Sequence, residues 1–489
     1  MSDQNLHVLI IGAGFAGIGL AHRLMRGGLR DFTILERAPS VGGTWRDNTY
    51  PGLACDIPSH LYSYSFAPNP DWSRFFAPQP EIRAYLERCA DMHGIRSHIR
   101  FEVGAIRADF DEGTGLWTVQ TTAGPITARF VVSGAGHALS QPVYPDIPGR
   151  ASFAGKTMHS ARWDGEYPLE GKAVAVIGTG ASAVQIVPAI ASRVGSLGVY
   201  QRTPAWVFPK PDWPTSKVER RLYRRIPPVQ RLMRGAVYSI FESFALGHVF
   251  APRLNAIHDW RGRRFLASSV RDRALREKLT PDFRFGCKRI LLSNEYYPAL
   301  QRENVELITD TITEIRPHAI ATADGKVRPV DVIAYATGFV AAEAAPPFAI
   351  HGRGGRTLEQ AWNNGGEAYL GTTVTGFPNL FLMIGPNLGL GHNSMIFMME
   401  SQFNYVIDAI RTLRRRRVRF MDVRADAQAR HNAWLQKRLA RSVWNTGGCR
   451  SWYLTKGGKN TTTWPGFTFE FFARTRRFDV ERYELGGAW

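Results

Sequence analysis

The stretch "LHVLIIGAGFAGIGLAHRL", residues 6–24, predicts a buried strand, a tight glycine turn and a helix. Gly12 permits the turn, Gly14 permits close approach of a pyrophosphate, and Gly17 permits the helix to pack on the strand. The N-terminus of the helix then faces the phosphates. This arrangement predicts a dinucleotide-binding unit of the α/β class.

The residues that follow extend this unit. "DFTILE", residues 31–36, predicts a second strand that ends at Glu36, nineteen residues after Gly17. A carboxylate at this place binds ribose hydroxyls. Residues 41–66 then contain a Gly-Gly pair followed by turn-rich and aromatic-rich chain. A loop of this kind can cover a large cofactor, which favours FAD over a nicotinamide cofactor.

A second strand–turn–helix pattern occurs at residues 172–190, "KAVAVIGTGASAVQIVPAI". Its turn contains Gly178, Gly180, Ala181, Ser182 and Ala183. The next strand, "LGVYQRTP", carries Arg202 where the first unit has an acid, and Thr203 adds a hydroxyl. An arginine pairs with a 2′-phosphate, so this unit is predicted to select NADPH. The alternative is a surface arginine.

Two dinucleotide sites in one chain indicate that electrons pass from NADPH to a flavin. The four cysteines, Cys55, Cys89, Cys287 and Cys449, are far apart and form no C-x-x-C pair. Their spacing argues against a disulfide framework, a dithiol redox couple, a zinc site and an iron–sulfur cluster. We therefore expect no metal, and oxygen is the remaining common electron acceptor.

The composition is that of an ordinary globular protein. The chain has 489 residues, and 44% of them are hydrophobic. A chain of this length is typical of a protein with two to four domains. Its net charge of +19 raises the possibility of nucleic-acid binding, but the basic residues are spread along the chain without clustered stacking aromatics. We find neither a signal segment nor about 18 consecutive apolar residues, so a cytoplasmic protein without a membrane or nucleic-acid partner is expected.

The segment "FAGKTMHSARWD", residues 153–164, matches the pattern F-x-G-x-x-x-H-x-x-x-W-[P/D]. The fixed positions are Phe153, Gly155, His159, Trp163 and Asp164. This pattern resembles the fingerprint of the Baeyer–Villiger monooxygenases. Four further segments are similar to parts of that family: "GTWRDNTYPGLACD" (43–56), "FGCKRILLSNEYY" (285–297), "AYATGF" (334–339) and "CRSWYLTKGGKNTTTWPG" (449–466).

The resemblance implies a reaction. NADPH reduces FAD, O₂ adds to flavin C4a, and the resulting peroxyflavin anion attacks a ketone to give an ester or lactone. The resemblance assigns Arg289 to keep the oxidant anionic, Asp56 to orient Arg289, and Lys288 to contact NADP⁺. It places His159 at the hinge between the nucleotide domains and leaves Trp163 as packing.

The remaining assignments concern the cofactor contacts. FAD is expected against the first glycine turn, Gly43, Thr44, Trp45, Asp56, Tyr62 and Asn387. NADPH is expected against Gly178, Gly180, Ala181, Ser182, Arg202, Thr203, Lys288 and Trp452. For Tyr62 and Trp452, a buried core aromatic is the alternative.

The expected architecture is α/β, with two Rossmann-like dinucleotide-binding domains and a helical insert. Residues 1–140 and 375–489 are assigned to the FAD domain, and residues 141–210 and 287–345 to the NADPH domain. Residues 211–286 are assigned to a helical subdomain and residues 346–374 to a linker. The expected substrate is a hydrophobic ketone, with O₂, in a monomer or small homo-oligomer.

Three alternatives stay open. An N- or S-oxygenating flavin monooxygenase would use the same cofactors with a protonated hydroperoxide. An NADPH oxidase would release peroxide without oxygenating a substrate. A nucleic-acid-binding protein would use the basic charge.

Overall fold

The computed structural model describes residues 8–136, 141–340 and 345–488 of the chain. The first unit is built on a five-stranded sheet in the order β19-β7-β1-β2-β3, in which all neighbours are parallel. Its strands are β1 (Val8–Ile11), β2 (Phe32–Glu36), β3 (Ile99–Phe101), β7 (Phe130–Ser133) and β19 (Leu380–Leu382). The predicted helix follows β1 as α1 (Phe15–Arg26).

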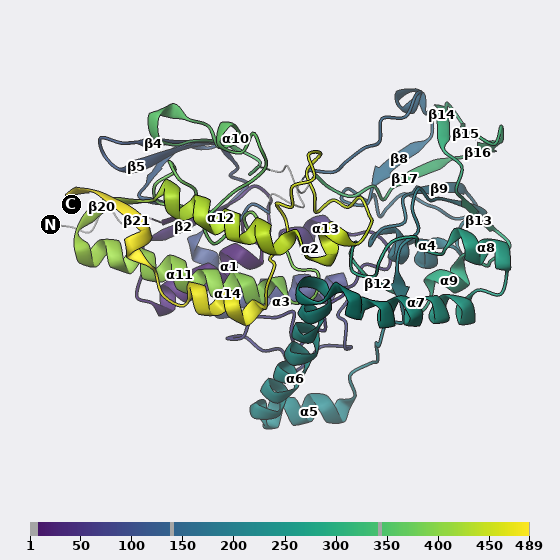
Figure 1. The fold of residues 1–489 in the computed structure, drawn as a ribbon, viewed down its shortest axis with the longest axis horizontal. Coiled ribbons are helices and arrows are strands. Elements are labelled where there is room, and N and C mark those ends of the chain that lie inside the picture. The colour runs from purple at the N-terminus through teal and green to yellow at the C-terminus, as the bar shows by residue number, and fades with distance from the viewer. Residues whose placement is uncertain (1–7, 137–140, 341–344, 489) are drawn as a thin grey trace.

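The second unit repeats this design with a five-stranded sheet in the order β13-β10-β9-β17-β8. The strands, all parallel, are β8 (Lys156–His159), β9 (Ala173–Ile177), β10 (Ser196–Tyr200), β13 (Val305–Ile308) and β17 (Val332–Tyr335). Helix α4 (Ala183–Ile190) follows the second glycine turn. The two sheets confirm the α/β class with two dinucleotide-binding folds, and Figure 1 shows them at opposite ends of the molecule.

Smaller sheets flank these two. The first contains β18 (Ala349–His351), β4 (Ala105–Asp111), β5 (Leu116–Thr121) and β6 (Gly124–Ala128). The second contains β14 (Ile312–Arg316), β15 (Ala319–Thr322) and β16 (Val327–Pro329). Two strand pairs complete the set: β11 (Val207–Phe208) with β12 (Leu291–Leu292), and β20 (Val418–Val423) with β21 (Tyr483–Ala488).

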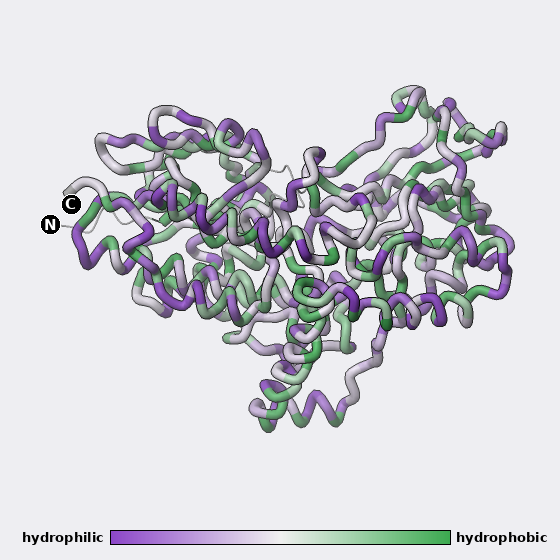
Figure 2. Tube along the Cα trace, viewed as in Figure 1, coloured by the Kyte–Doolittle hydropathy of each residue, from purple (hydrophilic) through white to green (hydrophobic). Residues whose placement is uncertain are grey.

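Residues 217–278 are largely helical, as the sequence pattern predicts. They form α5 (Lys217–Arg225), α6 (Pro227–Ala245), a π-helical turn η4 (Leu246–Phe250), α7 (Ala256–Ser269) and α8 (Arg273–Lys278). Figure 1 shows α5 and α6 projecting from the body of the molecule, with α7 returning under the second unit. Figure 2 shows hydrophobic residues along α6 as well as within the sheets.

The C-terminal quarter returns to the first unit. The long helix α11 (Met395–Arg416) packs against α1 and α14 (Thr468–Thr475), and α12 (Ala425–Leu439) and α13 (Val443–Thr446) follow β20. The remaining helices are α2 (Thr44–Asp47), α3 (Gln79–Met92), α9 (Tyr296–Ala299) and α10 (Leu358–Ala361), with 3-10 turns at Arg96–His98, Arg150–Ser152, Pro252–Asn255, Arg353–Gly355 and Val480–Arg482. No helix in the described ranges is long and apolar enough to cross a membrane.

The segment assigned as a linker, residues 346–374, has structure of its own. Strand β18 pairs with β4 of the first unit, and Leu358 of α10 is buried in the same hydrophobic cluster as Trp117. We propose that residues 346–374 belong with the FAD domain, and the other domain boundaries stay predictions. The predicted boundary at residue 140 lies outside the described residues.

The expectation drawn from the cysteines is wrong in one respect. Cys287 and Cys449 form a disulfide across 162 residues of sequence, with their Cα atoms 6.1 Å apart, while Cys55 and Cys89 are free and buried. Separation along the chain does not limit proximity in space, because the segment before β12 meets the loop after α13, where the Arg284 backbone nitrogen donates to the Gly447 carbonyl oxygen at 2.9 Å. Within the described residues, no group of three or more His, Cys, Asp or Glu side chains is arranged to hold a metal.

Candidate functional site

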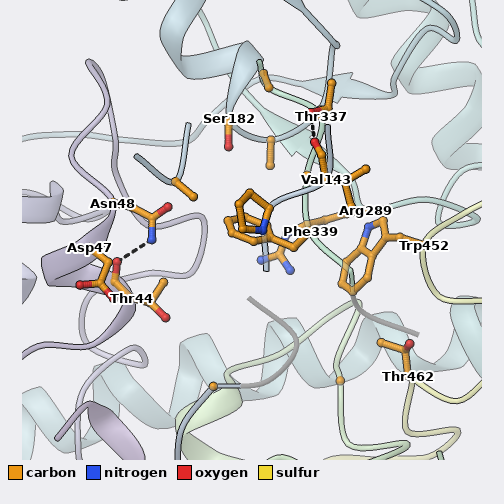
Figure 3. A pocket seen from close by; sticks show the side chains of 18 of the residues that line it. Thr44, Asp47, Asn48, Val143, Ser182, Arg289, Thr337, Phe339, Trp452 and Thr462 are labelled. Carbon is orange, nitrogen blue, oxygen red and sulfur yellow. Dashed lines mark hydrogen bonds between the residues drawn. The ribbon is translucent and has the colours of Figure 1, made fainter. Parts of the chain in front are cut away.

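A cavity of about 1550 Å³ extends from the first glycine turn to the second. Its wall includes Gly12, Gly14, Glu36, Gly43, Thr44, Trp45, Asp56, Tyr62, Gly178, Gly180, Ala181, Ser182, Arg202, Thr203, Lys288, Arg289 and Trp452. Figure 3 shows Thr44, Asp47 and Asn48 on one side and Arg289 and Trp452 on the other. The fold therefore brings most of the predicted site residues to one space.

The first glycine turn has no room for side chains at Gly12 and Gly17. Gly12 has a φ of +103°, and a β-carbon there would lie 2.7 Å from the Gly134 carbonyl oxygen. A β-carbon at Gly17 would lie 2.0 Å from the Gly12 carbonyl oxygen, so Gly17 serves helix–strand packing and does not line the cavity. A β-carbon on Gly14 would lie 3.6 Å from the Gly43 Cα, an ordinary contact, and both glycines line the cavity. This bare backbone fits a pyrophosphate.

Glu36 has a second role that the sequence did not indicate. Its carboxylate accepts hydrogen bonds from the Ala13 and Ala38 backbone nitrogens, at 2.9 and 3.0 Å. Arg46 forms an ion pair with the same carboxylate at 2.9 Å. Glu36 thus holds the glycine turn and the following loop together. Glu36 itself lies at the end of β2 and lines the cavity. Arg46 carries no motif signal, and sequence reasoning missed it.

The second glycine turn is open where a pyrophosphate would approach. Gly178 has a φ of +111°, and a β-carbon there would lie 2.5 Å from the Ala336 carbonyl oxygen. No atom lies within 4 Å of a would-be β-carbon on Gly180. Ala181 and Ser182 line the same part of the cavity. This turn also fits a dinucleotide.

Two cations meet near this second turn. Burial lowers the pKa of Lys288, and the positive charge of Arg202 lowers it further. The Lys288 ammonium lies 4.9 Å from the Phe283 ring centroid. Arg202 is exposed at the cavity wall beside Thr203, whose carbonyl oxygen accepts a hydrogen bond from the Thr179 hydroxyl at 3.1 Å. Such a pair of like charges suits an anionic group.

Arg289 and Asp56 form an ion pair in the cavity wall. The Arg289 Nε and Nη2 atoms lie 2.7 and 2.6 Å from Asp56 Oδ2. The carboxylate raises the pKa of Arg289, so the guanidinium stays charged. Both side chains are about one-third exposed, at 35% and 34%, and the exposure faces the cavity.

Tyr453 lies behind this ion pair and was not identified from the sequence. Its side chain is buried, and its hydroxyl has no hydrogen-bond partner among the described residues. Burial raises the pKa of Tyr453 to about 12, opposed by the nearby Arg289 charge. A tyrosine in a C-terminal loop gives no local signal, because its proximity to Arg289 depends on how the loop folds back.

Aromatic side chains line the cavity beside the first glycine turn. The Trp45 Nε1 donates to the Tyr62 hydroxyl at 3.1 Å, and both residues line the cavity. The Tyr62 ring also contacts Phe15, 5.3 Å between centroids. Tyr62 is only partly buried, and Trp452 is 44% exposed, so neither is a fully buried core aromatic.

Asn387 does not line the cavity. Its side-chain nitrogen donates to the carbonyl oxygens of Asn460 and Thr463, at 2.9 and 3.2 Å. It therefore anchors the C-terminal loop, while its neighbours Gly385 and Pro386 border the cavity.

The five fingerprint residues also lie outside the cavity wall, although Ala161 and Arg162 between them are part of it. His159 ends β8, is buried, and its Nδ1 accepts a hydrogen bond from the Ala161 backbone nitrogen at 3.0 Å. Its Nε2 lies 3.5 Å from the Thr337 hydroxyl, which donates to the Val143 carbonyl oxygen (Figure 3). Burial lowers the pKa of His159.

The other fingerprint side chains support β8. A β-carbon at Gly155 would lie 2.4 Å from the Asp331 carbonyl oxygen and 2.7 Å from the Phe153 ring. Asp164 forms an ion pair with Lys156 at 2.6 Å, and Trp163 packs on the hydrophobic core of the second unit. These contacts are structural. They hold β8 in place, and the C-terminal end of β8 at His159 lies next to Thr337.

Comparison with known proteins gives consistent matches. Residues 9–231 match the family model described as "Pyridine nucleotide-disulphide oxidoreductase". A protein of Pseudomonas aeruginosa named "Baeyer-Villiger monooxygenase" is 49% identical over 484 residues, covering 99% of this chain and 92% of the relative.

Two solved structures are similar over the whole chain. An oxidized steroid monooxygenase bound to NADP is 31% identical with a TM-score of 0.87, covering 99% of this chain and 100% of the other. The protein OTEMO in complex with FAD and NADP is 29% identical with a TM-score of 0.87, covering 98% and 99% of the two chains. With the two dinucleotide turns and the Arg289–Asp56 pair in one cavity, these matches show that the chain belongs to the FAD- and NADPH-dependent Baeyer–Villiger monooxygenases.

Proposed function

We propose that this enzyme converts a hydrophobic ketone to an ester or lactone, using NADPH and O₂, with Arg289 as the residue that determines the chemistry. The observation that carries the proposal is the Arg289–Asp56 ion pair, which faces a cavity bordered by both glycine turns. When bound, FAD supplies the redox chemistry with O₂ and NADPH supplies the hydride.

Arg289 acts as a permanent positive charge. A guanidinium stays protonated at any working pH and donates hydrogen bonds without releasing a proton. Asp56 holds it by contacts of 2.6 and 2.7 Å, which leaves the remaining N–H groups for the reacting oxygens. Positioned donors of this kind stabilise negative charge that develops during attack on a carbonyl.

Arg202 and Lys288 are proposed to bind the 2′-phosphate side of NADPH. Burial and the charge of Arg202 together lower the pKa of Lys288, and an anion between the two cations relieves their repulsion. Thr203 and Ser182 border the same region and supply hydroxyls. This arrangement favours NADPH over NADH.

The side chains near the flavin region favour an apolar substrate. Ile57, Met383, Leu390, Met395 and Met399 line the cavity. Trp452 covers another part of the wall and is proposed to exclude water from the site. A hydrophobic ketone therefore fits better than a charged one.

The test compares products from a ketone panel and a matched sulfide under NADPH and air. We expect ester formation by the yellow, flavin-loaded protein. Arg289→Ala is expected to retain flavin reduction by NADPH while ester formation falls by a factor on the order of 100 or more. Arg284→Ala, an exposed arginine of the same segment, is the matched control and is expected to leave both rates unchanged.

Two other products would support the alternatives. Sulfoxide without any ester would assign the chain to heteroatom oxygenation. Peroxide equal to the NADPH consumed, with every ketone, would indicate an oxidase. Normal ester yield from Arg289→Ala would remove that residue from the reaction.

A further inference from the structure

The disulfide connects two segments that both reach the cavity. Cys287 is completely buried and directly precedes Lys288 and Arg289. Cys449 directly precedes Arg450, Ser451 and Trp452, all of which line the cavity. The bond therefore joins the segment carrying the ion-paired arginine to the loop carrying the exposed tryptophan.

The Cys287 side of the bond is rigid. Cys287 packs in a small core with Trp206, Phe283 and Phe285. The Trp206 Nε1 donates to the Phe283 carbonyl oxygen at 2.9 Å, and the Asn255 side chain donates to the Phe285 carbonyl oxygen at 3.1 Å. The helical insert thus holds residues 283–287 in place independently of the loop.

The Cys449 side is attached to this rigid part by few contacts. The Arg284 backbone nitrogen donates to the Gly447 carbonyl oxygen at 2.9 Å, and a β-carbon at Gly447 would lie 2.6 Å from the Cys287 Cβ. Beyond the bond, Cys449 is partly exposed, and Arg450, Trp452 and the tip at residues 456–458 are exposed. The covalent bond is the strongest attachment at this end of the loop.

The other end of the loop has its own anchor. Asn387 donates to the carbonyl oxygens of Asn460 and Thr463, and the Asn460 side chain accepts from the Thr463 backbone nitrogen at 3.1 Å. Between these two attachments, the Tyr453 side chain is buried and Lys459 forms an ion pair with Glu367 at 2.6 Å, so Arg450–Trp452 are the residues between the disulfide and the next fixed side chain. Opening the bond would free one of these attachments, and the added freedom would fall on the residues next to it, Arg450–Trp452.

We propose that Cys287 and Cys449 are positioning residues whose bond sets Trp452 against Arg289, and that reduction by a dithiol uncouples NADPH oxidation from ester formation. The inference rests on the proposed function. With the bond open, water reaches the site more easily. A larger share of the NADPH oxidation then yields hydrogen peroxide and a smaller share yields ester. Binding of NADPH at Arg202 and Lys288 is expected to be much less affected.

The reduction step is an ordinary thiol–disulfide exchange. A thiolate of the dithiol attacks the sulfur of Cys449, the more exposed partner, and Cys287 leaves as a thiolate that takes up a proton. The second thiol of the dithiol then displaces Cys449 and closes a cyclic disulfide. Two protein thiols form, the dithiol is oxidised by two electrons, and the protons of the dithiol are retained on the protein.

The first measurement counts thiols in the denatured, flavin-loaded full chain. The chain has four cysteines, and the structure leaves two of them free. We expect two reactive thiols before treatment with dithiothreitol and four after it. Four thiols in protein prepared without reductant would overturn the proposal.

The second measurement follows ester and peroxide per NADPH after removal of excess dithiothreitol. We expect peroxide yield to rise about threefold or more in reduced wild type and in Cys449→Ser, with a much smaller change in the KM for NADPH than Arg202→Ala would cause. Dithiothreitol should then have no effect on Cys449→Ser. Cys89→Ala, a buried free thiol in α3, is the matched control and should respond as wild type does.

A third measurement separates this inference from the proposed function. Trypsin cleavage after the exposed residues Arg450 and Lys456 should be about fivefold faster in reduced protein and in Cys449→Ser. Equal cleavage and equal peroxide yield in the two redox states would overturn the inference. Faster cleavage in a protein that forms no ester from any ketone would instead refute the proposed function alone.

Discussion

Arg202 and Lys288 are the two residues that we propose determine the nucleotide preference. Both line the cavity near the second glycine turn, and the charge of Arg202 contributes to the lowered pKa of Lys288. The first unit has Glu36 at the corresponding strand end, where a carboxylate would repel a 2′-phosphate. We propose that this one position after each strand–turn–helix pattern distinguishes the two cofactors.

Arg202→Ala is expected to raise the KM for NADPH by a factor on the order of 10 to 100, because a charge-assisted contact to the phosphate is lost. The KM for NADH should change by less than about twofold, because NADH lacks that phosphate. Steady-state kinetics with both cofactors provides the measurement. Arg193→Ala, an exposed arginine of the same unit paired with Glu170, is the matched control. Equal effects on both cofactors would contradict the assignment.

At the scale of elements, α6 is connected to α14 and to the loop before α11, whose Asn393 lines the cavity. Glu242 of α6 is buried, and its carboxylate accepts hydrogen bonds from the Thr468 hydroxyl at 2.8 Å and the Asn393 side chain at 2.6 Å. It also accepts from the Thr468 backbone nitrogen at 2.5 Å, at the start of α14, where no side chain of α14 itself acts as a cap. The insert thus supplies the cap of a distant helix.

Glu242→Ala is expected to lower the free energy of unfolding by about 2–4 kcal/mol, because it leaves buried donors of Thr468 and Asn393 without a partner. Glu242→Gln should cost less, since the amide oxygen still accepts. Urea unfolding measures the change. The neighbouring exposed Ser243→Ala is the control and is expected to stay within about 0.5 kcal/mol of wild type. A loss as small as that of the control would show that the cap is dispensable.

At the scale of the whole molecule, histidines are spread through buried positions in a basic protein. Burial lowers the pKa of His22, His60 and His248 to about 4, and that of His392 and His431 to about 3. Their ordinary value is 6.5. The folded state therefore binds fewer protons than the unfolded state once the pH falls below 6.5, so these groups stabilise the fold above that pH and the stabilisation is lost on acidification.

Three carboxyls, one buried and two partly buried, act in the opposite direction. Burial raises the pKa of Asp422 to about 6 and also raises the pKa values of Glu400 and Asp479. Their protonation favours the folded state at low pH, but the histidines outnumber them. We expect the free energy of unfolding to fall by on the order of 3 kcal/mol between pH 6.5 and 5.

Urea unfolding across this pH range checks the expectation. His431→Gln should reduce the slope of stability against pH, whereas the exposed His318→Gln should leave it unchanged. Stability that is constant or rises on acidification would show that the carboxyls dominate.

The amino-acid sequence alone determined the features that depend on residues close together in the chain. The glycine turns, the acid or arginine at the following strand end, and the helical insert follow from local sterics and periodicity, and the structure confirms both nucleotide folds. The Arg289–Asp56 pair came from family resemblance, because its partners are 233 residues apart.

Tertiary structure alone decided the long-range contacts. The disulfide, the position of Tyr453 behind Arg289, the cap from Glu242 to Thr468 and the anchoring role of Asn387 each join segments from different parts of the chain. The hydrogen bond from Thr468 to Glu242 spans 226 residues and the disulfide spans 162. No local pattern encodes such pairs, because they form only when packing of the two units and the insert brings their segments together.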